Sequence, residues 1–268
     1  MNAFERLEKR MNELHLFAKK SLGQNFLVSD HVIQKIIDAT AELNCKRVVE
    51  VGPGCGALTD ILKEIYSDMI LVELDRALIE FWQSQNMKVI AGDALQIDWS
   101  FAADHILVSN LPYQISSSLV IDRSLDLKPL VGMILMFQKE VAQRIRATNQ
   151  SDHYGMLSVV AQEFWTIATV CDAGPRDFRP PPKVASRVLR FVPRVTTVID
   201  RPQYLQFVKA CFRQRRRVLT TNLNGLSEQD YDLNRLRPWF ELNKKSEKIR
   251  AEELSPIELN SLYHFLKV

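Results

Sequence analysis

The chain has 268 residues, of which 46% are hydrophobic and 25% are charged, and its net charge is +3. This length fits one large domain with a smaller one, and the apolar content excludes a largely disordered chain. The charge is unevenly placed, because residues 201–250 hold twelve Lys and Arg against five Asp and Glu. This part of the chain is therefore predicted to face a polyanion such as a nucleic acid.

The four cysteines lie too far apart in the sequence for a zinc-binding motif. Isolated thiols are typical of a reduced, cytoplasmic protein. The first twenty residues contain three glutamates and no apolar core, which disfavours a signal or transit peptide. The longest apolar run, residues 131–137, is too short to cross a bilayer. We expect a cytoplasmic protein without a membrane segment or a metal site.

Apolar periodicity predicts strands and helices that alternate along the first part of the chain. Residues 1–20 are predicted to be basic, partly helical and without a core-facing pattern, and a helix follows with buried Val32, Ile33, Ile36 and Ile37. The predicted strands are 47–51, 69–74, 87–90, 106–109, 131–137, 164–170 and 187–192, and the helices between them are 57–66, 76–84, 116–123 and 140–147. Strands that are continuous apolar runs indicate a parallel sheet covered on both faces, and hence an α/β fold.

After Pro193 the β-branched runs stop, and helical spacing continues in Tyr204, Phe207, Val208 and Cys211. We therefore expect two domains. Residues 1–195 would form the α/β catalytic domain, and residues 196–268 a smaller, basic, all-α domain that binds RNA.

A glycine-rich turn follows the first of the predicted sheet strands. Gly52, Gly54 and Gly56 can adopt positive φ and let a ligand approach the backbone, and the turn leads into the positive amino end of a helix. Glu73 ends the next strand about twenty residues on, where a carboxylate can bind ribose hydroxyls. The turn thus predicts a nucleotide-containing cofactor, although its spacing up to Ala57 also satisfies the nicotinamide dinucleotide fingerprint.

Two acidic residues favour S-adenosylmethionine over a nicotinamide cofactor. Glu50 precedes the first glycine by two residues, where its carboxylate can meet the cationic end of the donor directly or through water or amides. Asp93 follows the third of these strands and can accept a hydrogen bond from an adenine amino group. The same carboxylate can instead cap the following turn, and both roles are compatible because capping uses one oxygen.

The sequence Asn-Leu-Pro-Tyr at residues 110–113 follows another apolar strand. The Asn110 side-chain carbonyl and the Leu111 backbone carbonyl can accept both hydrogens of an exocyclic amine, and Tyr113 can stack on the base. Methyl transfer to adenine N6 needs alignment and stabilisation of positive charge rather than a strong base. Such an adenine must be splayed out of its RNA. An isolated tetrapeptide of this kind is equally typical of a strand-ending turn with a buried tyrosine.

Residues 178–184, Phe-Arg-Pro-Pro-Pro-Lys-Val, are a second candidate for substrate binding. A stiff proline loop can hold Phe178 against the other face of the base while Arg179 and Lys183 meet phosphates. A surface loop anchored by a buried phenylalanine is an equally good interpretation.

A cluster of arginines, Arg213, Arg215, Arg216 and Arg217, lies in the basic segment. These side chains cannot all face one way on a helix, but the cluster can cradle an RNA backbone, in which case binding depends strongly on salt. The alternative is a solvated charged segment.

In their order along the chain, these motifs resemble those of the ribosomal RNA adenine N6-dimethyltransferases. The resemblance covers residues 17–266 and rests on residues 20–27, 50–56, 73–75, 92–94, 110–113 and 178–184. Residues 212–219 and 250–255 are similar to the bacterial small-subunit (16S) enzymes rather than to the erythromycin-resistance methylases. Two departures are Cys55, where leucine is usual, and a longer N-terminal segment.

The resemblance implies a Rossmann-like, S-adenosylmethionine-dependent methyltransferase that acts as a monomer on the assembling small ribosomal subunit. Its expected reaction is N6-dimethylation of two adjacent adenines near the 3′ end of the small-subunit RNA. The predicted donor-binding residues are Gln24, Asn25, Leu27, Glu50, Gly52, Gly54, Gly56, Glu73, Asp93, Ala94 and Asn110. The predicted catalytic residues are Asn110, Leu111, Tyr113 and Phe178, and the predicted RNA-binding residues are Arg179, Lys183, Arg213, Arg215, Arg216 and Arg217.

Two other functions are compatible with parts of the pattern. A nicotinamide dehydrogenase would use the glycine-rich turn but would leave residues 110–113 and the basic segment without a role. An assembly factor that binds the immature subunit, with dispensable chemistry, can carry the same residues alone or together with methylation.

Overall fold

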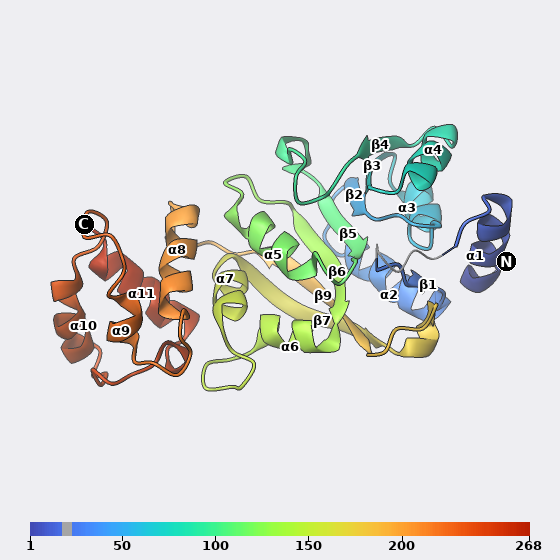
Figure 1. Cartoon of the computed structure of the whole chain (residues 1–268). Coiled ribbons are helices and arrows are strands. Elements are labelled where there is room, and N and C mark those ends of the chain that lie inside the picture. The colour runs from blue at the N-terminus through green and yellow to red at the C-terminus, as the bar shows by residue number, and fades with distance from the viewer. Residues whose placement is uncertain (18–22) are drawn as a thin grey trace. The chain divides into compact units, whose positions relative to one another are not determined.

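The computed structural model describes residues 1–17 and 23–268 (Figure 1). The chain divides into two compact units: Met1–Arg123, Lys128–Ala142 and Thr166–Pro193 form the first, and Ser124–Leu127, Gln143–Trp165 and Arg194–Val268 form the second. The last passage into the second unit follows Pro193, close to the expected boundary. The second unit also contains residues 143–165, which a single division at residue 195 assigns to the first domain. The division into domains 1–195 and 196–268 stays a prediction.

A seven-stranded sheet in the order β4-β3-β2-β5-β6-β9-β7 forms the core of the first unit (Figure 1). Its strands are β2 (Arg47–Val51), β3 (Asp68–Glu73), β4 (Lys88–Ala91), β5 (Ile106–Asn110), β6 (Gly132–Gln138), β7 (Trp165–Ala173) and β9 (Ser186–Pro193). The five strands from β4 to β6 pair in parallel, and β9 is antiparallel to β6. Consecutive residues are buried along β2, β3, β5 and β6, as continuous apolar runs require. The α/β prediction is confirmed.

Helices follow the strands at nearly the predicted positions. They are α2 (Asp30–Ala41), α3 (Thr59–Ile65), α4 (Arg76–Ser84), α5 (Ser116–Leu125) and α6 (Lys139–Arg146). The predicted apolar face of α2 is buried. A separate two-stranded sheet pairs β1 (Phe26–Leu27) with β8 (Phe178–Arg179), so segments about 150 residues apart in sequence lie together, as β-sheet pairing allows.

Two parts of the sequence interpretation are wrong. The first residues form helix α1 (Ala3–Glu13), which agrees with their predicted helical character, but this helix buries Ala3 and Leu7 in the core of the first unit, where no core-facing pattern is predicted. Phe4, Leu7 and Met11 do recur at helical spacing, but many charged residues lie between them, and such a composition is typical of an exposed segment. Helix α7 (Met156–Phe164), which precedes β7, was not predicted. Its apolar residues continue directly into those of the strand, so periodicity alone does not separate the two elements.

The part of the second unit after Arg194 is helical, as predicted. Its helices are α8 (Arg201–Cys211), α9 (Leu219–Leu223), α10 (Leu236–Leu242) and α11 (Pro256–Leu266). Aromatic rings form its core, with the ring centroids of Tyr204 and Tyr263 5.2 Å apart and those of Phe207 and Tyr263 5.5 Å apart. Among the described residues, no helix has both the length and the apolar character that a membrane span requires.

Candidate active site

A cavity of about 240 Å³ lies at the carboxyl ends of the parallel strands. It is lined by the turns after β2, β3, β4 and β5, by residues 23–27 and by helix α1, all of which belong to the first unit. Every predicted donor-binding residue lines this cavity. Asn110, Leu111 and Tyr113 of the acceptor turn, residues 110–113, line it as well. Residues 20–22, the start of the N-terminal motif, lie outside the described residues. The structure thus brings the two predicted halves of the site to one place.

The glycine-rich turn has the backbone conformation that its sequence predicts. Gly52, Gly54 and Gly56 have φ values of +67°, +52° and +83°, which side-chain-bearing residues rarely adopt. A Cβ atom on Gly54 would lie 3.1 Å from the ring of Phe26. The indole Nε1 of Trp82 donates to the Gly54 carbonyl at 3.0 Å and holds the turn in place. The turn is therefore a rigid cradle with its backbone exposed to the cavity.

Glu50 lines the cavity from the end of β2 and is almost fully buried. Thr59 Oγ1 donates to Glu50 Oε2 at 2.7 Å. Burial raises the pKa of Glu50 to about 8; the Thr59 hydrogen bond lowers it in part, and nearby carboxylates raise it further. The ligand-free protein therefore carries a largely neutral Glu50 at pH 7, and a cationic ligand would favour its ionised form.

We expect Glu50→Gln to flatten the pH dependence of stability between about pH 4.5 and 8. In this range the folded protein holds a proton that the unfolded chain has released. The free energy of unfolding contributed by Glu50 therefore falls as pH rises, at up to about 1.4 kcal/mol per pH unit. Denaturant unfolding at a series of pH values measures this slope. Glu64→Gln, which removes an exposed carboxyl, is the control, and an identical slope in wild type and Glu50→Gln would contradict the assignment.

Glu73 and Asp93 present carboxylates to the cavity from the ends of β3 and β4. The backbone amides of Leu74 and Asp75 donate to Glu73 Oε1 at 2.7 and 2.8 Å. The amide of Leu95 donates to Asp93 Oδ1 at 2.9 Å, so the capping role exists. The backbone of Gly54 also hydrogen-bonds the Glu73 carboxylate. These contacts orient both side chains, and the carboxylate oxygens retain acceptor capacity for a bound ligand.

The acceptor turn is held by two contacts to distant segments. Asn110 Nδ2 donates to the backbone carbonyl of Asn25 at 3.0 Å. Because that partner can only accept, Oδ1 is the atom of Asn110 that can accept hydrogen bonds from a substrate amine. The Tyr113 hydroxyl bonds Ser186 Oγ at 2.8 Å, and burial raises the pKa of Tyr113, so its hydroxyl stays neutral at pH 7.

Phe178 is not in the lining of the cavity. It is 3% exposed, lies in β8 opposite Leu27 and packs in the core. This position agrees with the anchoring interpretation, and the stacking of Phe178 on a base stays a prediction. Arg179 and Lys183 are exposed at the ends of this loop, so a role in phosphate binding stays a prediction.

Several residues that shape the site were missed by sequence reasoning. Trp82 holds the glycine-rich turn, as described, and Trp99 Nε1 donates to the Ala94 carbonyl at 2.8 Å. Arg10 Nη1 donates to the Cys55 carbonyl at 2.6 Å and to Asp60. Among these residues, only the tryptophans could have been suspected of a structural role from the sequence, because a buried indole N–H needs a hydrogen-bond acceptor.

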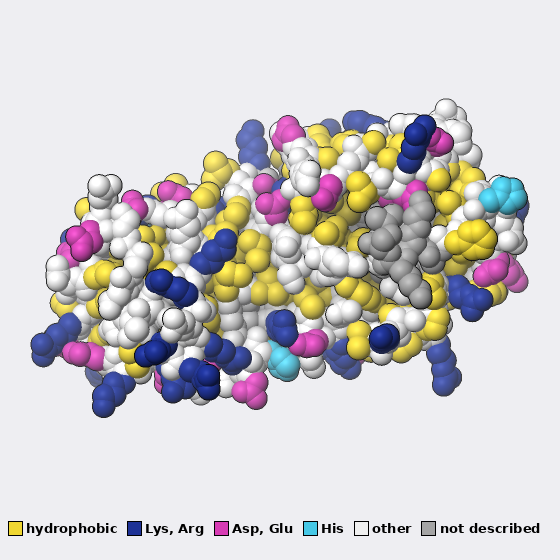
Figure 2. All heavy atoms as spheres, in the orientation of Figure 1, with side chains coloured by type: hydrophobic (Ala, Val, Ile, Leu, Met, Phe, Trp, Pro, Cys, Tyr) yellow, Lys and Arg dark blue, Asp and Glu magenta, His cyan; other side chains and the backbone are white. Residues whose placement is uncertain are grey.

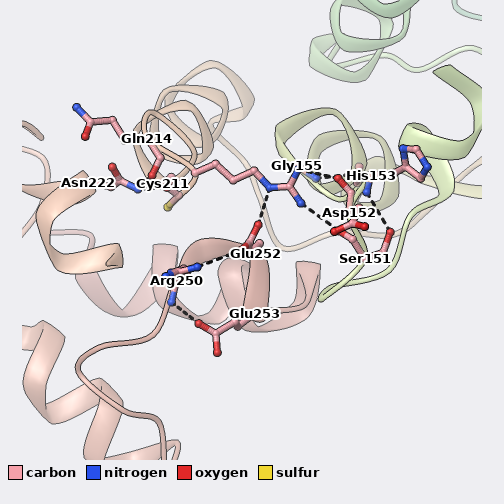
Figure 3. Close-up of polar contacts among 12 residues, drawn as sticks. Ser151, Asp152, His153, Gly155, Cys211, Gln214, Asn222, Arg250, Glu252 and Glu253 are labelled. Atoms are coloured by element: carbon pink, nitrogen blue, oxygen red, sulfur yellow. Dashed lines mark hydrogen bonds and ion pairs between the residues drawn. The ribbon is translucent and has the colours of Figure 1, made fainter. Parts of the chain in front are cut away.

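The arginine cluster splits into two pairs with different surroundings. Arg215 donates to Glu252 at 2.5 Å and to the carbonyls of Asp152 and Ser151 at 2.6 and 3.3 Å. Figure 3 labels these three acceptor residues. Arg213 donates to the Asn222 carbonyl at 2.8 Å. The exposed Arg216 and Arg217 have no side-chain hydrogen bond or ion pair with the described residues. Figure 2 shows Lys and Arg side chains gathered over the helices of the second unit.

Comparison with known proteins agrees with this geometry. A model of the family described as "Ribosomal RNA adenine dimethylase" matches residues 16–257. "Ribosomal RNA small subunit methyltransferase A" of Bdellovibrio bacteriovorus is 52% identical over 266 residues, which cover 97% of each chain. The protein of the same name from Syntrophotalea carbinolica is 37% identical over 262 residues, 92% of this chain and 98% of that relative.

A solved structure shares the fold. The dimethyladenosine transferase of Plasmodium falciparum superposes with a TM-score of 0.73 at 24% sequence identity, covering 90% of this chain and 97% of that one. The family match spans the basic segment and the cavity lining from residue 23 onward, and the two relatives cover more than nine-tenths of this chain. The chain therefore belongs to the ribosomal RNA adenine dimethylase family.

Proposed function

We propose that this protein transfers methyl groups from S-adenosylmethionine to N6 of two adjacent adenines near the 3′ end of small-subunit ribosomal RNA. The observation that carries the proposal is the position of Asn110. Its side chain lines the same cavity as the glycine-rich turn, with Nδ2 engaged and Oδ1 left to accept. The relative at 52% identity is named for small-subunit RNA methylation, which supports this substrate.

The residues around the cavity fit S-adenosylmethionine. The positive-φ turn lets the donor approach the backbone, the Glu73 carboxylate can accept from ribose hydroxyls, and Asp93 can accept from the adenine amine. When bound, the donor supplies an electrophilic methyl on a sulfonium, which is a good leaving group. The protein contributes a preorganised site in which carboxylates and the turn set the donor's orientation.

The acceptor turn would position the nucleophile. Asn110 Oδ1 and the Leu111 carbonyl accept the two N6 hydrogens, which favours a pyramidal amine and stabilises the positive charge that grows on nitrogen. Tyr113 presents a ring whose hydroxyl is fixed by Ser186. No group has to remove a proton before methyl transfer.

A methylation assay tests the proposal. The protein is incubated with S-adenosylmethionine and small ribosomal subunits that lack the modification, and the RNA is digested and analysed by mass spectrometry. We expect dimethyladenosine in one short fragment near the 3′ end. Unmodified RNA, or modification confined to large-subunit RNA, would overturn the proposal.

The same proposal includes a monomeric enzyme that acts on the assembling small subunit in the cytoplasm. The basic side chains of the second unit support an RNA-facing role for it. If the protein acted only as an assembly factor, a variant that cannot methylate would fully complement a deletion strain. If methylation is the function, the same variant would fail to complement it.

The two pairs of arginines predict opposite effects of neighbouring substitutions. We expect Arg215→Gln to lower the free energy of unfolding by about 1 kcal/mol, because two carbonyls and Glu252 lose their donor at a solvent-exposed site. We expect Arg216→Gln to leave the free energy of unfolding unchanged. It should reduce the slope of the logarithm of the RNA-binding constant against the logarithm of salt concentration by the amount that corresponds to about one phosphate contact.

Denaturant unfolding and RNA binding at several salt concentrations measure the two quantities on both variants. A reduced salt slope with unchanged stability in Arg215→Gln would contradict its assignment as a structural residue. An unchanged slope in Arg216→Gln would remove Arg216 from the RNA-binding surface.

A further inference from the structure

Helix α1 forms part of the wall of the donor cavity. Ala3, Arg6 and Leu7 line the cavity alongside the glycine-rich turn. The family match begins at residue 16, so α1 lies outside the matched segment. These side chains are thus an addition to the donor site that the family motifs do not describe.

Arg6 is the only cationic side chain among the described residues that line the cavity, whereas Glu50, Glu73 and Asp93 contribute carboxyl groups. Its Nε and Nη2 atoms are buried and have no hydrogen-bond partner within residues 1–17 and 23–268. Asp30 Oδ1 lies 3.7 Å from Nη2, an ion-pair distance that is too long for a hydrogen bond, and it already accepts from the Ala3 amide at 3.1 Å. These two nitrogens of the guanidinium beside the cavity can therefore donate to a bound ligand. An acceptor would relieve the free-energy cost of leaving buried donors unpaired.

The helix that carries Arg6 is firmly attached. Its first turn is closed by a capping box between Asn2 and Glu5. One turn after Arg6, Arg10 binds Asp60 through both terminal nitrogens, at 2.9 and 3.2 Å, and lies 5.0 and 5.1 Å from the ring centroids of Phe81 and Trp82. These contacts join α1 to helices α3 and α4. The Arg6 guanidinium is therefore preorganised, which lowers the cost of binding a ligand.

We propose that Arg6 binds the carboxylate of the methionine portion of S-adenosylmethionine. This carboxylate is the single anionic group of the donor, and a guanidinium matches its planar, two-oxygen geometry. The pairing also matches the charges of the cavity to those of the ligand. Arg6 would meet the ligand's carboxylate, and the carboxyl groups of the cavity would meet its cationic and hydroxyl groups. The inference rests on the donor assignment of the proposed function.

Calorimetry with two donors tests the pairing without RNA or turnover. Wild-type protein, Arg6→Gln and Arg6→Lys are titrated with S-adenosylmethionine and with decarboxylated S-adenosylmethionine. Lys9→Gln is the matched control, since Lys9 is an exposed cation on the same helix that does not line the cavity. Unfolding curves establish that each variant is folded.

We expect Arg6→Gln to weaken S-adenosylmethionine binding about tenfold to a hundredfold, with little change for the decarboxylated compound. Arg6→Lys should lose less, and Lys9→Gln should match wild type. Equal weakening of both ligands, or no change in either, would overturn the role of Arg6. If wild-type protein bound neither ligand, the donor assignment itself would fail, which is a distinguishable result.

Discussion

Replacing Asn110 with alanine is expected to lower the rate of N6 methylation by about a hundredfold to a thousandfold at saturating donor and RNA. The variant loses the oxygen that accepts from the N6 amine while positive charge grows on nitrogen. It also loses the Nδ2 contact that ties the turn to the Asn25 carbonyl. Single-turnover assays measure the chemical step directly.

Binding measurements separate this effect from a loss of structure. RNA affinity should remain near that of wild type in Asn110→Ala, because the basic side chains lie elsewhere in the sequence. Gln96→Ala removes an exposed carboxamide that does not line the cavity, and it should leave the rate unchanged. Full activity in Asn110→Ala would refute the acceptor pocket.

Replacing Glu73 with alanine is expected to weaken S-adenosylmethionine binding about a hundredfold, within the range for a lost charged hydrogen-bond acceptor with two hydroxyl partners. The carboxylate is buried, and Oε1 is fixed by the amides of Leu74 and Asp75. The substitution therefore removes both the proposed ligand contact and the group that orders the end of β3. Calorimetric titration with the donor measures the change.

A second substitution distinguishes these two causes. Glu73→Gln keeps an oxygen that can accept from the backbone amides and loses only the charge, so its effect should be smaller, about tenfold. Glu80→Ala removes an exposed carboxylate from the following helix and should have no effect. Unchanged donor affinity in Glu73→Ala would remove Glu73 from the cofactor site.

Motif chemistry and the family match together decide the choice of cofactor. The spacing of Gly52, Gly54 and Ala57 is compatible with a nicotinamide dinucleotide as well as with S-adenosylmethionine. The ribosomal RNA adenine dimethylase family, matched over residues 16–257, uses the methyl donor. The glycine spacing reports only a tight turn with an exposed backbone, which many nucleotide cofactors can use.

The sequence by itself determined the parallel sheet, the positive-φ turn and the family. Each depends on a local property: apolar runs report burial, glycines permit rare backbone angles, and short motifs keep their order along the chain. The strand ranges predicted for β2 and β5 agree with the structure to within one residue. The meeting of residues 50–56 with residues 110–113 also follows from the sequence, because the carboxyl ends of parallel strands share one edge.

Only the tertiary structure decided which side chains have a structural or binding role that their residue type and local sequence do not indicate. Arg215 resembles its neighbours in sequence but is bound by Glu252 and by carbonyls of a loop more than sixty residues earlier. Phe178 lies in the core because β8 pairs with β1, and Arg6 lines the donor cavity because α1 packs beside the glycine-rich turn. Hydrogen bonding and burial depend on partners that are distant in the chain, and no local pattern of residues encodes which distant segment supplies them.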